Sequence, residues 1–184
     1  MFIIILGGII INITIFAISK DKAKFFIRVA NSFKCKHDIT FLTTRYSSYG
    51  IIKRSGYKVH MLQEFIKDDV NINEFKSYES EAILMDVKTG LLSENRAKEQ
   101  FKWLIKGFKN YLTVRKIDKL ILWNGSMLQG FSASLVADKY NIKKIFFEVG
   151  NFPNKIFLDE KGVNAKSSLM GKDLTVCKNY HEGV

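Results

Sequence analysis

The stretch DKLILWNGSMLQGFSASLVADKYNIKKIFFEV, residues 118–149, contains the pattern that decides the fold. Residues 119–123 have the composition of a strand, and the Asn124-Gly125 pair behind them is a typical chain break. Residues 131–140 have a helical pattern, and residues 144–148 form the next apolar run. A strand, a helix and a second strand in so short a span predict a β–α–β crossover. The chain should therefore contain a parallel sheet.

The preceding residues extend the same alternation toward the N-terminus. Apolar side chains recur at helical spacing, while short β-rich runs at 39–43 and 57–62 indicate strands. The helical set comprises Phe25, Phe26, Val29 and Phe33. Residues 45–56 are expected to form a short helix or loop, and the polar stretch 63–90 allows no firm assignment. The predicted fold is α/β, a Rossmann-like parallel sheet flanked by helices.

The first 18 residues, MFIIILGGIIINITIFAI, allow two interpretations. One is a buried strand at residues 2–6, broken by Gly7-Gly8 and followed by a helix. The other is a membrane anchor, because an apolar run of this length reaches the lower limit for a span and a basic segment follows it. Asn12 and Thr14 would be unfavourable at the centre of a lipid-facing helix, which favours the strand. Both alternatives stay open at this level.

A long amphipathic helix is expected to start near Ser93. Its apolar positions fall on one face, with lysines on the other. Ser93 can cap the helix, and Glu94 and Lys98 form a favourable i,i+4 pair. The apolar face consists of Ala97, Phe101, Leu104, Ile105, Phe108, Tyr111 and Leu112. A parallel sheet needs such a helix to cover it.

Composition limits both the class of the protein and its partners. The chain has 184 residues, of which 47% are hydrophobic, and this supports one folded domain over 1–184 rather than a disordered chain. Two distant cysteines and three histidines make no convincing zinc site, and no metal is expected. The formal charge of +11 favours anionic partners such as phosphorylated substrates or an anionic membrane surface. The charge is dispersed and no recognition motif appears, so nucleic acid is not an expected partner.

Ligands of open parallel sheets bind beyond the carboxyl ends of the strands. The loops expected there are Gly7-Gly8, residues 124–126 and residues 148–153. No complete dinucleotide fingerprint, P-loop, nucleophile elbow or Asp-x-Asp motif is present, and no cofactor is expected. Glu148 is the most suggestive residue, because a carboxylate that ends an apolar strand at this edge can act as general acid or base. A surface Glu paired with a lysine is an equally good interpretation.

Several short elements, taken in order, resemble the capsule polysaccharide biosynthesis family. They are Trp123-Asn-Gly125, the Phe147-Glu-Val-Gly-Asn-Phe-Pro153 run, Leu158-Asp-Glu-Lys-Gly-Val-Asn164 and Ser167-Ser168. The likeness is strong over about residues 118–170 and weaker over 1–62. The family includes bacterial glycosyltransferases that add 3-deoxy-manno-octulosonic acid (Kdo) to lipid or glycan acceptors.

The resemblance implies one half of a GT-B type glycosyltransferase, which would use a CMP-activated donor of Kdo or a similar sugar without a bound metal. Glu148 matches the acidic residue of the Phe-Glu element and is the implied catalytic residue. Gly8 and the cleft residues of the matching elements would bind substrate; these are Asn124, Gly125, Gly150, Asn151, Asn164 and Ser167.

Family members usually exceed 300 residues, and their nucleotide is generally held by a C-terminal domain. The chain therefore resembles the N-terminal, acceptor-side half, and a C-terminal partner domain or chain is expected. Its other partners would be a nucleotide-sugar donor and a glycan or glycolipid acceptor. The expected location is the cytoplasm, including the inner face of the bacterial plasma membrane. A non-catalytic binding or assembly module of the same pathway is the alternative function.

Overall fold

The computed structural model describes residues 10–33, 37–150, 153, 155–163 and 166–170. These residues form an α/β fold around a six-stranded sheet with the order β3-β2-β1-β4-β5-β6. The strands are β1 (Asn12–Phe16), β2 (Asp38–Thr43), β3 (Lys58–Met61), β4 (Lys119–Trp123), β5 (Lys143–Val149) and β6 (Ile156–Asp159). The first five run parallel, and β6 pairs antiparallel with β5 at the edge. The predicted Rossmann-like parallel sheet is confirmed.

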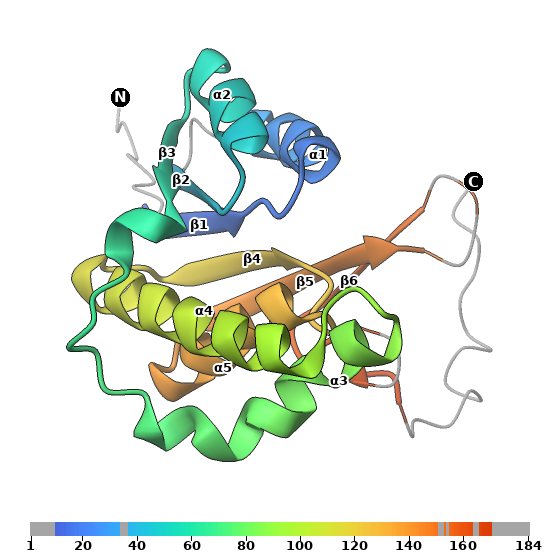
Figure 1. The fold of residues 1–184 in the computed structure, drawn as a ribbon. Coiled ribbons are helices and arrows are strands. Elements are labelled where there is room, and N and C mark those ends of the chain that lie inside the picture. The colour runs from blue at the N-terminus through green and yellow to red at the C-terminus, as the bar shows by residue number, and fades with distance from the viewer. Residues whose placement is uncertain (1–9, 34–36, 151–152, 154, 164–165, 171–184) are drawn as a thin grey trace, which may run out of the picture.

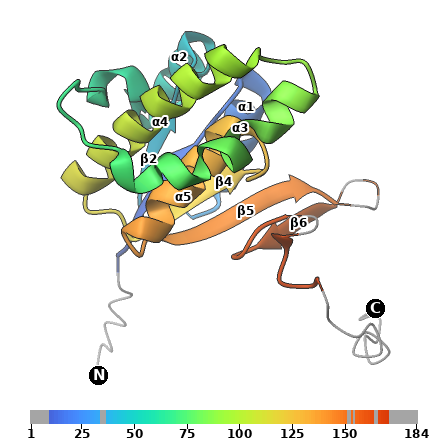
Figure 2. The ribbon, with the colours of Figure 1, turned by 60° about the horizontal axis from the view of Figure 1, so that its bottom comes forward.

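Helices cover the two faces of this sheet unequally (Figure 1). On one face lie α1 (Lys20–Asn31) and α2 (Tyr46–Arg54), and α1 packs through Phe26 against Trp123 of β4 and Phe147 of β5. On the other face lie α3 (Glu79–Lys88), α4 (Glu94–Val114) and α5 (Leu128–Lys139). Figure 2 shows β5 and β6 projecting beyond this second helical layer. The arrangement is the three-layer sandwich typical of doubly wound sheets.

The central strand β1 bears on the membrane-anchor interpretation of the N-terminus. The predicted strand at residues 2–6 and the Gly7-Gly8 break lie outside the described residues, and β1 is formed by Asn12–Phe16. This strand pairs with β2 on one side and β4 on the other, in register Thr14 with Thr40 and Thr14 with Leu120. A membrane-spanning helix over residues 1–18 is therefore wrong for residues 12–16. In the part of the chain that the structure describes, no helix has the length and apolar character needed to cross a bilayer.

Two apolar cores account for the strand assignment of residues 12–16. Ile13 and Ile15 face α1 and α2, whereas Phe16 packs in the core beneath α4. Thr14 points to the α4 side as well, and its hydroxyl lies 3.1 Å from the Tyr111 hydroxyl. The polar residue that would be costly in lipid is thus satisfied inside the protein. β-branched residues on both faces are typical of a strand buried between two helical layers.

The remaining elements largely confirm the sequence pattern. α4 extends over 21 residues with its predicted apolar face buried, and the Glu94–Lys98 ion pair is present at 2.5 Å. Ser93 occupies the N-cap position, but its side chain makes no capping hydrogen bond. The unassigned stretch before α4 forms the 3-10 helices η1 (Leu62–Phe65) and η2 (Asn73–Tyr78), followed by α3. The β4–α5–β5 crossover lies where it was predicted.

Candidate functional site

A cleft of about 480 Å³ opens at the carboxyl ends of β1 and β4, the two central strands. Chain connections leave β1 and β4 in opposite directions at this point, which is where ligands of doubly wound sheets bind. The β1–α1 loop contributes Ser19, and the residue before α2 is Arg45. The remaining walls come from α1, from α3 and α4 with the connection between them, from the end of β4 with the β4–α5 loop and the start of α5, and from the end of β5.

Asn124 and Glu148 meet in this cleft. The Asn124 side-chain amide donates from Nδ2 to Glu148 Oε2 over 2.5 Å. Its Oδ1 accepts a hydrogen bond from the Ser126 backbone N–H at 2.7 Å. The other Glu148 oxygen, Oε1, accepts from the Val149 backbone N–H at 2.9 Å. Each carboxylate oxygen can accept a further hydrogen bond, so Glu148 is held in one orientation and can still bind a ligand.

The backbone at Asn124 has φ +50°, in the left-handed region. Asparagine is among the few non-glycine residues that adopt this conformation at low cost, because its side chain bonds locally. The turn lets the chain leave β4 and enter α5 directly behind the cleft. The left-handed conformation that places Asn124 beside Glu148 therefore lies at the chain break that the Asn124-Gly125 pair predicts.

Gly130, which is not among the predicted site residues, allows α5 to pack tightly against this turn. A Cβ on Gly130 would lie 2.3 Å from the Asn124 carbonyl oxygen. A Cβ on Gly125 would lie 2.6 Å from the Phe146 ring. The two glycines thus have packing roles, one against backbone and one against an aromatic side chain. The spacing of Gly130 behind the turn was the available sequence signal, since a helix-packing glycine is a regular part of such turns.

The N-terminus of α5 is already capped by a carboxylate. Asp86 of α3 is 8% exposed, and its Oδ2 accepts a hydrogen bond from the Leu128 backbone N–H at 2.8 Å. A carboxylate in this position complements the positive end of the helix dipole. Asp86 therefore occupies the place where a ligand phosphate would bind in many doubly wound folds. The Leu128 N–H is therefore engaged by the protein itself, and the other groups of the cleft suited to an anionic ligand are its side-chain cations.

Lys22 supplies one such cation. Its ammonium nitrogen lies 3.2 Å from the centroid of the Trp123 ring. Burial lowers the pKa of Lys22 from its ordinary value, while the negative charges of Glu148 and Asp21 act in the opposite direction. The ammonium thus lies in the field of the Glu148 carboxylate, above an aromatic face that favours a cation. Lys22 and Glu148 present opposite charges to the same cleft.

Arg45 supplies the second cation and stands at the start of α2. Its side chain is exposed, and its backbone N–H donates to Thr43 Oγ1 at 3.2 Å. The adjacent Thr44 donates from its hydroxyl to Gln129 Oε1 of α5 at 3.1 Å. The hydrogen bond between Thr44 and Gln129 ties the β2–α2 loop to α5. Arg45 is thereby held at the cleft rim.

The structure brings together only some of the predicted site residues. Asn124 and Glu148 line the cleft, and Gly125 lies behind it. Gly150 does not line the cleft: its N–H donates to the Lys155 carbonyl at 2.8 Å, closing the β5–β6 connection. Gly8, Asn151 and Asn164 lie outside the described residues.

Ser167 does not line the cleft either; it belongs to a segment ordered by Asp159. Ser168 donates to Asp159 Oδ2 from both its hydroxyl and its backbone N–H. Lys161 and Gly162 donate their backbone N–H groups to Asp159 Oδ1. Burial opposes ionisation of Asp159, but the hydrogen bonds from Ser168, Lys161 and Gly162 outweigh it and lower its pKa to about 2. Asp159, the last residue of β6, therefore has a structural role.

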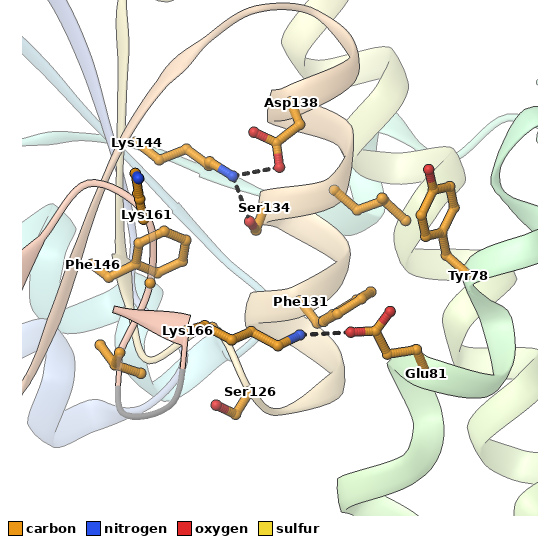
Figure 3. A pocket seen from close by; sticks show the side chains of 14 residues that line it. Tyr78, Glu81, Ser126, Phe131, Ser134, Asp138, Lys144, Phe146, Lys161 and Lys166 are labelled. Carbon is orange, nitrogen blue, oxygen red and sulfur yellow. Dashed lines mark hydrogen bonds and ion pairs between the residues drawn. The ribbon is translucent and has the colours of Figure 1, made fainter. Parts of the chain in front are cut away.

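A second cavity, of about 210 Å³, lies on the other side of the β4–α5 loop (Figure 3). Lys144 donates to Ser134 Oγ at 2.8 Å and to Asp138 Oδ2 at 2.5 Å. Lys166 donates to Glu81 Oε1 at 2.6 Å, joining the segment after β6 to α3. The ammonium groups of Lys144 and Lys166 are thus engaged by the protein's own carboxylates. The cleft holding Glu148 remains the better candidate site.

Two cleft residues that sequence reasoning missed, Ser19 and Lys22, follow β1 in the chain. Once β1 is placed at Asn12–Phe16, Ser19 and Lys22 lie directly behind its carboxyl end. Ser19 Oγ accepts from the Lys22 backbone N–H at 3.3 Å, a normal helix cap. Within the described residues, no group of three or more His, Cys, Asp or Glu side chains could hold a metal ion. The chain matches no known family model and no curated protein.

Proposed function

We propose that the chain is a glycosyltransferase of bacterial capsule or surface polysaccharide assembly, or its acceptor-side domain. The donor would be CMP-activated Kdo or a similar sugar. The single observation that carries the proposal is the Glu148 carboxylate. Asn124 orients it within the cleft from which the chain connections leave β1 and β4 in opposite directions. This is the position from which a general base can reach a substrate hydroxyl.

In the proposed step, Glu148 accepts the proton of an acceptor hydroxyl while that oxygen forms a bond to the anomeric carbon of the donor. The bond between this carbon and the donor phosphate oxygen breaks, and CMP leaves with the electron pair. Lys22 and Arg45 are the cations of the cleft that stabilise negative charge on the sugar acid or the phosphate. Orientation by Asn124 spares the carboxylate the cost of reorganising during the step.

The proposed location follows from charge and chemistry. A chain with a formal charge of +11 is attracted to the anionic cytoplasmic face of a bacterial membrane, where a lipid-linked acceptor would be presented. The non-catalytic module is the competing proposal, and one contact favours it. Glu148 Oε1 bonds the neighbouring Val149 N–H, an arrangement that a purely structural carboxylate also shows.

A transfer assay separates the two proposals. The full chain, alone and with a matching C-terminal half, is incubated with CMP-Kdo and a lipid-linked acceptor. The Glu148→Gln variant removes the base but keeps the shape, and Glu99→Gln on the exposed surface of α4 is the control. We expect turnover that falls about 10²- to 10⁴-fold in Glu148→Gln and is unchanged in Glu99→Gln. Absence of turnover in both settings, or full turnover by Glu148→Gln, rules out the catalytic role.

A further inference from the structure

A second polar pocket lies at the opposite edge of the sheet, beside the amino ends of β1, β2 and β3. It has a volume of about 220 Å³ and includes Arg115 and Lys116, which follow the C-terminus of α4. In Figure 1 this edge is the left side of the sheet, away from the arrowheads of β1 and β4. The pocket is therefore separate from the cleft that contains Glu148.

The pocket has an excess of positive charge. Lys58, Arg115 and Lys116 line it together with a single carboxylate, Asp38, for a net charge of +2. Within the described ranges, the side chains of these three cations make no hydrogen bond or ion pair. Other lysines of the same molecule are paired, including Lys109, whose ammonium lies 2.7 Å from Glu74 Oε1.

The guanidinium of Arg115 has an unused buried donor. Its Nε atom is buried and has no hydrogen-bond partner. Buried polar atoms nearly always have partners, so an orphaned donor in a cationic pocket indicates a missing acceptor. The buried hydroxyls of Tyr111 and Thr14, 3.1 Å apart, line the same pocket. They add neutral hydrogen-bonding groups to the charged donors.

The positive charge of the pocket also affects the pKa of His60, which lies on β3. Burial is the main cause that lowers its pKa, and the positive charges of Arg115 and Lys58 lower it further, while Glu64 raises it. The C-terminal end of α4 opposes this field, but a helix terminus carries only about half an elementary charge. A second carboxylate, Asp118, lies beside the pocket and accepts a hydrogen bond from the Asn12 N–H at 2.7 Å. Three cations outweigh the two carboxylates and the partial charge of the helix terminus together.

We propose that this pocket binds a phosphate group, with the Arg115 guanidinium as its principal ligand and Lys58 and Lys116 as supporting cations. The planar guanidinium suits oxyanion recognition, since it offers several donors in a fixed geometry. A cavity of about 220 Å³ suits a small soluble phosphate compound better than a nucleotide. The proposal concerns a different site from the Glu148 cleft and does not depend on the proposed transferase activity.

The test is a calorimetric titration of the full chain with inorganic phosphate in a phosphate-free, low-salt buffer. We expect saturable binding that weakens about tenfold or more in Arg115→Gln and in Lys58→Gln. Arg96→Gln on α4 is the control of equal charge change, because Arg96 is exposed and lies outside the pocket. Asp38→Asn removes the repelling carboxylate and should strengthen binding. Circular dichroism establishes that each variant is folded, and Lys58→Gln serves if Arg115→Gln does not fold.

Two further measurements separate phosphate binding in the pocket from general attraction of anions and from binding to lipid. Bound phosphate should raise the pKa of His60, measured by NMR, because the anion offsets the charges of Arg115 and Lys58. Vesicles of phosphatidylglycerol in phosphatidylcholine test a lipid headgroup as the source of the same chemistry. The proposal is overturned by non-saturable binding, by equal weakening in Arg96→Gln and Arg115→Gln, or by binding to vesicles without binding to phosphate.

Discussion

The Asn124 side-chain amide holds the Glu148 carboxylate at 2.5 Å, linking the turn after β4 to the end of β5. The same side chain closes the turn that starts α5, through the Ser126 N–H. One residue therefore shapes the entry to a helix and orients the only carboxylate among the predicted site residues.

Replacement of Asn124 should distinguish conformation from hydrogen bonding. Asn124→Ala loses the bonds to Glu148 and Ser126 and also places alanine at φ +50°. Asn124→Gly loses the same bonds but tolerates this conformation. We expect Asn124→Ala to lower the free energy of unfolding by about 1 kcal/mol more than Asn124→Gly does. Urea denaturation measures the difference, and equal stabilities would contradict the role of the backbone conformation.

Gly130→Ala should destabilise the protein, because its new Cβ would clash with the Asn124 carbonyl oxygen at 2.3 Å. Overpacking against backbone costs about 1–3 kcal/mol or more. Gly50→Ala in α2 is the matched control: its nearest neighbour is the Arg54 side chain at 3.4 Å. Gly50→Ala should be neutral or stabilising by about 0.5–1 kcal/mol, since alanine is the better helix former. Thermal unfolding that ranks the two variants the other way would refute the packing role of Gly130.

Asp86 should stabilise the start of α5. Asp86→Ala removes the acceptor of the Leu128 N–H, and we expect a loss of about 1–2 kcal/mol, as for other helix caps. Asp69→Ala, at an exposed position, should change stability by less than about 0.5 kcal/mol. Hydrogen exchange at the Leu128 amide should accelerate in Asp86→Ala alone. Unchanged exchange at that amide would show that the cap does not contribute.

Asp159 should make stability fall in acid. Its pKa is depressed from 3.8 to about 2 in the folded state, so its stabilising contribution is complete above about pH 4. That contribution is lost as the pH falls toward 2, because the unfolded state then binds the proton more readily. The variant Asp159→Asn should be less stable at pH 7 and should lose less stability between pH 4 and pH 2. Parallel stability curves for the two proteins would contradict this linkage.

Most of the fold could be predicted because the spacing of apolar residues and the positions of chain breaks indicate directly where buried helices and strands lie. The β4–α5–β5 crossover and α4 show strong patterns of this kind. The strand at Asn12–Phe16 was not predicted, because residues 2–6 and 12–16 are both β-rich and only the pairing with β2 and β4 shows that the second run lies in the sheet. β6 was missed because Ile156–Asp159 is short and lies at the sheet edge.

The site was less predictable because it is assembled from distant segments. Glu148 and Asn124 could be chosen because Asn124 follows one strand of the crossover and Glu148 lies near the end of the other. Lys22 and Arg45 could not, since their positions depend on where β1 ends and on how the β2–α2 loop packs against Gln129. Gly150 was predicted to bind substrate because it follows a strand. Its observed role is to close the β5–β6 connection.

The most direct test of the central claim uses Trp123, whose ring lies beneath the Lys22 ammonium in the cleft. A Trp103→Phe background leaves Trp123 as the one tryptophan of the chain. We expect titration with Kdo to give a saturable change in its fluorescence. The affinity for Kdo obtained from this titration should fall about tenfold in Lys22→Gln or Arg45→Gln and stay unchanged in Arg96→Gln. No saturable change, or a response that is the same in Lys22→Gln and Arg45→Gln as in the background protein, would contradict sugar-acid binding in this cleft.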